Sequence, residues 1–134
     1  MSDKPTIRVV AAVLEQDGKY LITQRRPTAV MPLLWEFPGG RVEEGEKDAI
    51  ALARELQARM GIEVSIGDEL FSVVKSYESY TVDFHVYLCD LVSEEVRRLR
   101  INDFRWVTSD ELEDFPFPAA DQETVEALLR GENA

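Results

Sequence analysis

The chain has 134 residues, enough for one sizeable hydrophobic core, and we expect a single domain over residues 1–134. Its content of 45% hydrophobic and 31% charged residues excludes a disordered or fibrous protein. The net charge of −11 argues against nucleic acid or an anionic membrane as a partner, because both are repelled at long range. The single cysteine, Cys89, excludes an internal disulfide, and residues 1–5 lack a secretory signal pattern, so we expect a cytoplasmic protein.

The first 40 residues are predicted to form two strands, a loop and a turn. A β-branched, apolar run at residues 7–14 predicts a buried central strand, because it alternates too little for a half-exposed one. A turn at 16–19 leads to a second strand at 20–24, and prolines mark an irregular loop over 27–34. The sequence Pro38-Gly39-Gly40 predicts a sharp turn.

A helix, three further strands and two shorter helices are predicted to follow. Apolar residues recur at helical spacing over 47–60, and Gly61 is placed to end that helix. Strands are predicted at 63–75, where a break at Gly67 stays open, at 81–92 and at 104–107. Thr108 or Ser109 is expected to cap a short helix, and Asp121 a last one over 122–130. This order predicts an α/β sandwich with a mixed sheet.

Arginines gather in two parts of this acidic chain. The early group is Arg25, Arg26, Arg41, Arg54 and Arg59, and the late group is Arg97, Arg98, Arg100 and Arg105. Composition alone favours scattered surface arginines. A small anionic substrate is nevertheless compatible with the acidic chain if local basic groups or a metal ion neutralise it.

Residues 35–62 carry the strongest chemical signal. They read WEFPGGRVEEGEKDAIALARELQARMGI, which is a strand end, a glycine turn, an acidic loop and an amphipathic helix. Such a loop and helix can hold a cation with carboxylates and backbone carbonyls, and the cation can hold a phosphate chain. The segment resembles the Nudix box, G-x5-E-x7-R-E-U-x-E-E-x-G-U, where U is aliphatic. The matching positions within 40–62 are Gly40, Glu46, Arg54, Glu55, Leu56, Gly61 and Ile62.

The resemblance covers nearly the whole chain and points to the MutT and CTP pyrophosphohydrolase branch of the Nudix family. The further matching segments are residues 22–26, 105–107, 111–112 and 115–121. The resemblance implies an α/β/α sandwich and hydrolysis of a nucleoside triphosphate to the monophosphate and pyrophosphate, by water that bound Mg²⁺ or Mn²⁺ activates. It also implies catalytic roles for Glu46, Arg54 and Glu55, and a metal ion bound by Gly39 and Glu55.

Two positions depart from the box. The pattern has consecutive glutamates at positions 58 and 59, which in the family are principal metal ligands one helical turn beyond Glu55. This chain has Ala58 and Arg59 there. Ala58 removes a ligand, and a guanidinium a few ångströms from a divalent cation repels it by roughly 4 kcal/mol at an effective dielectric of ~20. We therefore expect Mg²⁺ binding and Mg²⁺-dependent turnover to be weak or absent.

Arg59 has two interpretations. It follows Glu55 by four residues, with the glutamate on the N-terminal side, which favours a helical ion pair in which the arginine takes the place of the metal. The alternative is an exposed arginine in an ordinary surface pair. For Glu46 and Arg54, the alternative to a catalytic role is a buried pair that braces the loop against the helix.

The candidate substrate-binding residues also keep structural alternatives. Arg25 matches a position of this branch that contacts substrate phosphate, or it is a surface arginine at a strand end. Asp121 lies where the branch places a base-reading residue, and it is also suited to cap a helix. Phe37, Tyr77 and Tyr80 are able to stack on a base, but aromatic residues in strands are more often part of the core.

Three other features are interpreted as structural. His85, in the strand 81–92, is expected to pack or to line a pocket wall, and Cys89 on the same face is expected to be a small buried hydrophobe. The late acids Glu94, Glu95 and Asp103 offer a carboxylate of the kind the family uses as a base or an extra ligand. Beside arginines, however, they are more typical of a solvated face.

Two functions remain open from the sequence. The first is a MutT-like pyrophosphohydrolase for nucleoside triphosphates or related nucleoside diphosphate derivatives, with activity that is weak or lost, or with rearranged ligands that include Glu43 and Glu44. The alternative is a catalytically silent Nudix domain that binds a nucleotide or another anion through Arg25 and Arg59. Both imply a small-molecule nucleotide partner and a monomer or homodimer.

Overall fold

A computed structural model describes residues 4–29, 32–93 and 95–129. The strands are β1 (Thr6–Gln16), β2 (Lys19–Gln24), β3 (Trp35–Glu36), β4 (Gly39–Arg41), β5 (Val64–Ser76), β6 (Thr81–Leu91) and β7 (Asp103–Val107). The helices are α1 (Asp48–Met60), the 3₁₀ helix η1 (Asp110–Asp114) and α2 (Ala119–Leu129). Within these described ranges, no helix combines the length and the apolar character needed to cross a bilayer.

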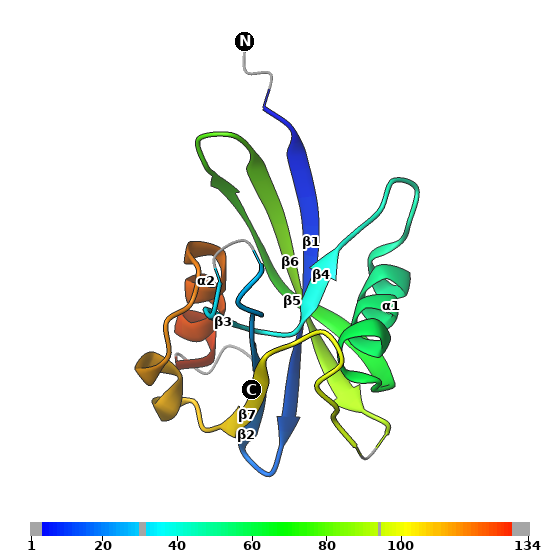
Figure 1. Ribbon diagram of the computed structural model, residues 1–134, viewed down its shortest axis with the longest axis vertical. Helices are drawn as coiled ribbons and strands as arrows, with labels where there is room; N and C mark the ends of the chain where they lie inside the picture. Colours follow the sequence, from blue (N-terminus) through cyan, green and yellow to red (C-terminus); the bar gives the residue numbers. More distant parts are fainter. Residues whose placement is uncertain (1–3, 30–31, 94, 130–134) are drawn as a thin grey trace.

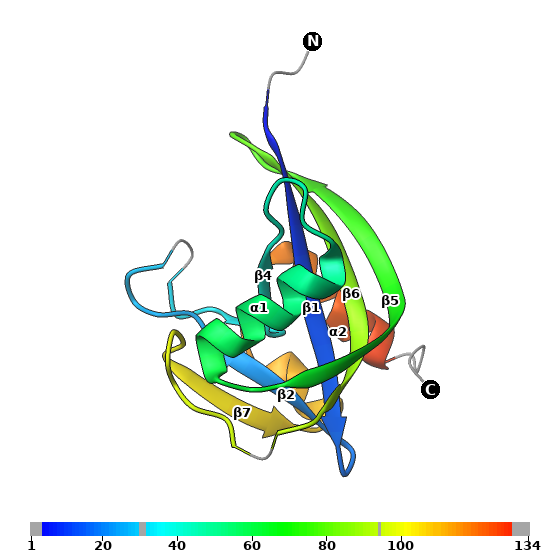
Figure 2. The ribbon, with the colours of Figure 1, turned by 90° about the vertical axis from the view of Figure 1, so that its right-hand side faces the viewer.

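One mixed sheet of seven strands lies between the two longer helices (Figure 1). Its order is β3-β2-β1-β6-β5, with β4 paired to β1 and β7 paired to β2. β1 runs parallel to β6 and antiparallel to β2 and β4. Figure 2 shows α1 crossing in front of β1. The predicted α/β sandwich with a mixed sheet is confirmed.

The apolar run in β1 serves two cores, one on each face of the sheet. Val10, Ala12 and Leu14 pack in a cluster that contains the buried face of α1. Ala11 and Val13 alternate with them and pack in a second cluster that contains residues of α2. A strand with both faces buried has little polar alternation, which explains the continuous apolar pattern of residues 7–14.

The turns and the central helix agree with their sequence signals. Asp17 and Gly18 both have positive φ, as a two-residue hairpin between β1 and β2 requires. Gly61 ends α1 with a φ of 66°, and its N–H donates to the Gln57 carbonyl at 2.9 Å. β5 continues through Gly67, but its register with β6 is irregular between Ile66 and Phe71. The open break at Gly67 is therefore an irregularity within one strand.

The predicted sharp turn at residues 38–40 is confined to a bend at Pro38, because Gly39 and Gly40 belong to β4 and pair with β1. The strand approaches so closely that a Cβ on Gly39 would lie 2.0 Å from the Val10 carbonyl oxygen. Gly39 is thus needed for the close packing of β4 on β1, whereas glycine pairs in a sequence are more often typical of turns.

The predicted capping role of Asp121 is wrong. α2 begins at Ala119, so Asp121 lies in the first turn of the helix. Pro118 explains the earlier start, since its carbonyl accepts from the Asp121 and Gln122 N–H groups at 3.0 and 3.2 Å. In the other short helix, Ser109 occupies the N-cap position of η1 without a side-chain cap bond. Residue 130, the predicted end of the last helix, lies outside the described residues.

Candidate functional site

A cavity of about 630 Å³ opens where β1, β3, β4 and β6 meet α1 and the start of α2. It is lined by five arginines, namely Arg25, Arg26, Arg41, Arg59 and Arg100, and by three carboxyl groups, those of Glu36, Glu55 and Asp121. The local charge is therefore positive, although the chain as a whole carries −11. A cavity of this sign attracts a small anion even within an acidic protein.

Glu55 projects from α1 into this cavity, and both of its carboxylate oxygens are occupied. Arg54 donates from Nη1 to Oε1 at 2.9 Å, and Arg59 donates from Nε to Oε2, also at 2.9 Å. The carboxylate lies so close to β4 that a Cβ on Gly40 would be 2.4 Å from its Cδ atom. The glycine at the first position of the box thus makes room for Glu55.

Arg54 joins Glu46 and Glu55 into one network with the loop before α1. Its Nε and Nη2 atoms donate to the two carboxylate oxygens of Glu46 at 2.8 and 2.9 Å, and Nη2 also reaches the Arg41 carbonyl. Glu46 accepts in addition from the Glu43 N–H, and these bonds, led by that of Arg54, lower the pKa of Glu46 to about 2. This geometry favours the bracing interpretation of Glu46 and Arg54.

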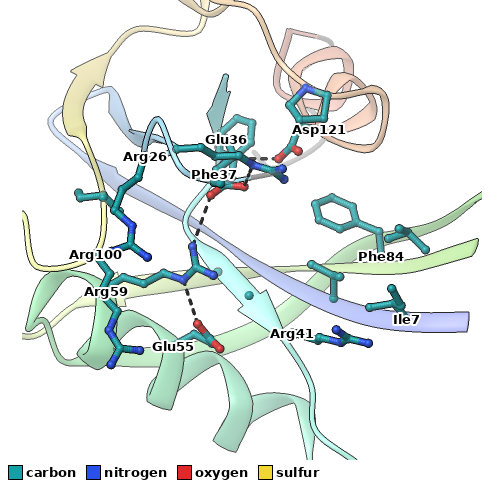
Figure 3. Close-up of a pocket in the computed structure, with 18 of the residues that line it drawn as sticks. Ile7, Arg26, Glu36, Phe37, Arg41, Glu55, Arg59, Phe84, Arg100 and Asp121 are labelled. Carbon is teal, nitrogen blue, oxygen red and sulfur yellow. Dashed lines mark hydrogen bonds and ion pairs between the residues drawn. The ribbon is translucent and has the colours of Figure 1, made fainter. Parts of the chain in front are cut away.

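Arg59 lies between two carboxylates (Figure 3). Besides its bond to Glu55, its Nη1 atom lies 3.7 Å from Oε2 of Glu36, and Arg25 donates to the other oxygen of Glu36 at 2.9 Å. Arginines and glutamates therefore alternate across the cavity wall. With its side chain 31% exposed, Arg59 agrees better with the interpretation that it occupies the metal's place than with an ordinary surface pair.

The side chains at this position do not fit the divalent ion that the resemblance implies. Ala58 offers no oxygen, and the carboxylates of Glu55 and Glu36 face the guanidinium of Arg59. Gly39 lines the cavity, but a backbone group alone does not replace the missing carboxylates. Across residues 4–29, 32–93 and 95–129, no group of three or more His, Cys, Asp or Glu side chains is arranged to hold a metal ion.

Asp121 is a buried carboxyl group in the cavity wall, with 4% of its surface exposed. Its Oδ1 atom accepts from the Phe37 N–H at 3.3 Å. Burial, with a smaller contribution from Glu36, raises the pKa of Asp121 to about 8, so this group is largely protonated near pH 7. A neutral carboxyl group can both donate and accept hydrogen bonds, which suits it to contact a polar ligand.

Apolar and aromatic side chains form another part of the cavity, from Ile7, Val9, Tyr77, Tyr80, Val82 and Phe84. Tyr77 and Tyr80 stack on each other with ring centroids 5.0 Å apart. In Figure 3, Ile7 and Phe84 lie on the side opposite Arg26 and Arg100. Phe37 also lines the cavity, but its ring is buried and stacks on Phe117, which is the packing role that the sequence left open.

Glu36 lines the cavity but was not singled out as a site residue by the sequence, and Arg26, Arg41 and Arg100 were noted only as members of the two arginine groups. For Arg26 the signal was its position next to Arg25, at the end of β2. For Arg100 no local signal exists, since a distant loop brings it to the cavity. Members of both the early and the late arginine group thus line the same cavity.

The other acidic candidates lie elsewhere. Asp103 pairs with Arg98 and Arg105, and neither it nor Glu95 lines the cavity. Glu94 lies outside the described residues. Glu43 and Glu44 line a second, smaller depression at the loop before α1.

A separate charge network joins the start of α1 to the sheet. Arg8 donates to both oxygens of Asp48 at 2.7 Å and to Asp83 at 3.1 Å, and Tyr87 donates to Asp48. His85 lies between Asp83 and Glu69, so its surroundings are carboxylates. His85 does not line the cavity.

Cys89, on the same strand, is buried in the core beside α1, as predicted. Burial raises the pKa of its thiol to about 12.

Comparison with known proteins identifies relatives over almost the full chain. The model of the NUDIX domain family matches residues 9–127. The chain is 32% identical to a CTP pyrophosphohydrolase of Escherichia coli, over 92% of this chain and 91% of that protein. It is also 32% identical to an 8-oxo-dGTP diphosphatase of Haemophilus influenzae, over 95% of this chain and 94% of that protein.

Solved structures share the fold. A MutT NUDIX hydrolase from Burkholderia pseudomallei has a TM-score of 0.82 and 25% identity, over 92% of this chain and 98% of that one. The MutT protein from Methanosarcina mazei superimposes over the full length of both chains with a TM-score of 0.87, at 22% identity. The family model, the relatives and the α/β sandwich agree, and this chain belongs to the Nudix hydrolase family.

Proposed function

We propose that this chain binds a nucleoside triphosphate, or a related nucleoside diphosphate derivative, in the arginine-lined cavity, and that its Mg²⁺-dependent pyrophosphohydrolase activity is weak or absent. The observation that carries the proposal is the position of Arg59 between Glu55 and Glu36. A fixed positive charge there can bind phosphate oxygens, but it repels a divalent cation.

The two sides of the cavity support a nucleotide as the ligand. Guanidinium groups match phosphate oxygens in charge and planar geometry, and the apolar wall with its tyrosine pair matches a base or a sugar. The names of the relatives mention CTP and 8-oxo-dGTP, which places their substrates in the same class. The net charge of −11 favours such a small nucleotide over a nucleic acid.

Arg59 is suited to exchange its partners when phosphate enters. Its contact with Glu36, at 3.7 Å, is longer than a charge-assisted hydrogen bond, and Glu36 keeps its bond to Arg25. Glu55 likewise keeps its bond to Arg54. The guanidinium of Arg59 can therefore turn to a ligand without leaving either carboxylate unpaired, which lowers the cost of binding.

A second candidate is a weak pyrophosphohydrolase that uses a rearranged set of carboxylates. The observation in its favour is that Glu46, Arg54 and Glu55 interact directly at the positions that match the box. These residues and the adjacent Glu43 and Glu44 would then supply the ligands for Mg²⁺ or Mn²⁺.

A substrate panel separates the two candidates. Ribonucleoside and deoxyribonucleoside triphosphates and nucleotide sugars are incubated with Mg²⁺ or Mn²⁺, and thermal shifts are recorded with the metal and with EDTA. Stabilisation by nucleotide in EDTA without turnover supports the binding module. Efficient turnover that requires metal would contradict it and select the hydrolase.

Substitution of Arg59 tests the residue that carries the proposal. Arg59→Ala should remove most of the nucleotide-dependent stabilisation in EDTA, because the cavity then lacks the guanidinium group that is able to turn to the phosphates, whereas Glu36 and Glu55 only keep their pairs with Arg25 and Arg54. Arg59→Lys should recover only part of it, since a point charge lacks the planar fork that contacts two oxygens. Equal shifts for the wild type and Arg59→Ala would show that Arg59 has no part in binding.

A further inference from the structure

The loop after β6 brings a second arginine beside Arg59. The Arg97 N–H donates to the Met60 carbonyl at 3.0 Å, and the Leu99 and Arg100 N–H groups donate to the Arg59 carbonyl at 3.1 and 2.9 Å. These carbonyls at the end of α1 lack partners within the helix, so the loop satisfies them. Arg100 is thereby fixed next to Arg59 at the cavity.

A third arginine reaches the same side from the loop after β2. The Arg25 N–H donates to the Leu34 carbonyl at 2.9 Å, and the Ala29 N–H donates to the Arg26 carbonyl at 3.1 Å, which holds the backbone on both sides of Arg26. In Figure 3, Arg26, Arg59 and Arg100 approach the cavity from one side. Three arginines from three separate segments of the chain thus line one side of the same cavity.

Two of these three charges have no compensating carboxylate among the residues that the structure describes. Arg59 pairs with Glu55 and Glu36, but within the part of the chain that the structure describes, no carboxylate forms an ion pair with the side chain of Arg26 or Arg100. Like charges held close together repel one another. A multiply charged anion would relieve this repulsion, and a singly charged one would do so less well.

The form of that anion follows from the charges. A free di- or triphosphate presents several adjacent anionic oxygens, each able to accept from a guanidinium. Its Mg²⁺ complex carries two fewer negative charges and brings a hydrated cation toward three arginines. The arrangement therefore favours the metal-free anion.

We propose that Arg26, Arg59 and Arg100 form a polyphosphate site that binds the phosphate chain in its metal-free form, so that Mg²⁺ competes with the protein for the ligand. The inference rests on the proposed nucleotide-binding function and deepens it by naming the ionic form of the ligand. It assigns to the late arginine group, through Arg100, a role in binding.

The test measures the binding of tripolyphosphate, pyrophosphate, orthophosphate and a nucleoside triphosphate by calorimetry in EDTA. Each titration is repeated with excess Mg²⁺ and with NaCl at the same ionic strength. We expect affinity to rise from orthophosphate to tripolyphosphate, and to fall at least tenfold with Mg²⁺ relative to NaCl. Equal affinity in Mg²⁺ and NaCl would overturn the proposal, and this comparison needs no variant.

Three single variants test the arginines themselves. Arg26→Ala and Arg100→Ala should each weaken tripolyphosphate binding at least fivefold. The matched control is Arg105→Ala, which removes the same charge from a side chain that is 59% exposed and outside the cavity. If both cavity variants bind as the control does, with folding checked by circular dichroism, the polyphosphate site is refuted.

The two proposals fail in different ways. If the nucleoside triphosphate binds but tripolyphosphate does not, the polyphosphate site is refuted and nucleotide binding stands. If tripolyphosphate binds with the expected dependence on Arg26 and Arg100, but the nucleoside adds no affinity, the arginine site stands and nucleotide specificity fails.

Discussion

The charge networks at the two ends of α1 contrast in their balance of charge. At the start of the helix, Arg8 is engaged by Asp48 and Asp83, and a further carboxylate, Glu69, lies beyond His85. At the other end, Arg59 lines a cavity together with Arg26 and Arg100. The side chains of Arg26 and Arg100 have no carboxylate partner among the described residues. Paired charges that join two elements stabilise the fold, whereas an excess of like charge beside a cavity costs stability until a ligand arrives. The difference supports the second network as the proposed binding site.

The largest expected effect comes from converting the second network into a metal site. Ala58→Glu combined with Arg59→Glu should raise Mg²⁺-dependent hydrolysis of nucleoside triphosphates by at least ~10²-fold, since each preorganised charge at such a site contributes ~3 kcal/mol. Phosphate release from the product pyrophosphate, after addition of a pyrophosphatase, measures the rate.

The control for this conversion is the same pair of substitutions with Glu55→Gln, which should abolish the gain. A folded double variant without any gain would contradict the view that positions 58 and 59 alone separate this chain from an active hydrolase.

The next effect concerns Asp121 in the cavity wall. Its pKa is raised from 3.8 to about 8, so between pH ~4 and ~8 the unfolded chain releases a proton that the folded protein keeps. Stability should therefore fall as the pH rises through this range, with a slope of at most about 1.4 kcal/mol per pH unit. Asp121→Asn keeps an acceptor for the Phe37 N–H and should flatten the slope, as measured by urea unfolding from pH 5 to 8.

Asp114→Asn, at an exposed position outside the cavity, serves as the matched control and should leave the slope unchanged. If Asp121→Asn and Asp114→Asn give the same profile, the carboxyl group of Asp121 does not titrate with folding.

A smaller effect is expected when the network of Arg8 and the network of Arg59 are compared in their contributions to stability and to binding. Arg8→Met should lower the free energy of unfolding by about 1 kcal/mol, because Asp48 loses two charge-assisted bonds, and should leave binding in the cavity intact. Arg59→Met should lower the free energy of unfolding by less, because Arg25 still pairs with Glu36 and Arg54 with Glu55. The same substitution should weaken tripolyphosphate binding. Urea unfolding and calorimetry on both variants give the comparison, and the reverse pattern would refute it.

The smallest effect is at acidic pH, where the network of Arg8 titrates in the opposite sense to Asp121. The hydrogen bond from Arg8 holds the pKa of Asp48 below its ordinary value of 3.8. Asp48 thus adds stability above pH ~4 that is lost as the pH falls through its lower folded pKa. Asp48→Asn should be less stable near pH 6 and lose less on acidification, in unfolding curves from pH 6 to 2. An acid limb identical to that of the wild type would contradict this role for Asp48.

The sequence by itself determined the family and the local geometry of its signature segment. Residues 48–60 form a helix because their apolar side chains recur at helical spacing, and the same spacing places Arg59 one turn beyond Glu55. The departure from the two glutamates of the Nudix pattern could be read at positions 58 and 59, since helical geometry alone sets which side chains share a face. Interactions over three or four residues depend little on the rest of the chain.

Only the tertiary structure decided how the cavity is composed. Glu36 of β3 and Arg59 of α1 face each other at the cavity, and Arg100 arrives through bonds between a distant loop and the end of α1. Asp121 lies buried in the first turn of α2, beside the Phe37 N–H of a segment more than 80 residues away in sequence. The two glycines of β4 pair with β1, and a side chain on Gly39 would clash with β1, whereas one on Gly40 would clash with Glu55. These contacts join segments far apart in sequence, and their geometry depends on how sheet and helices pack, which no local pattern specifies.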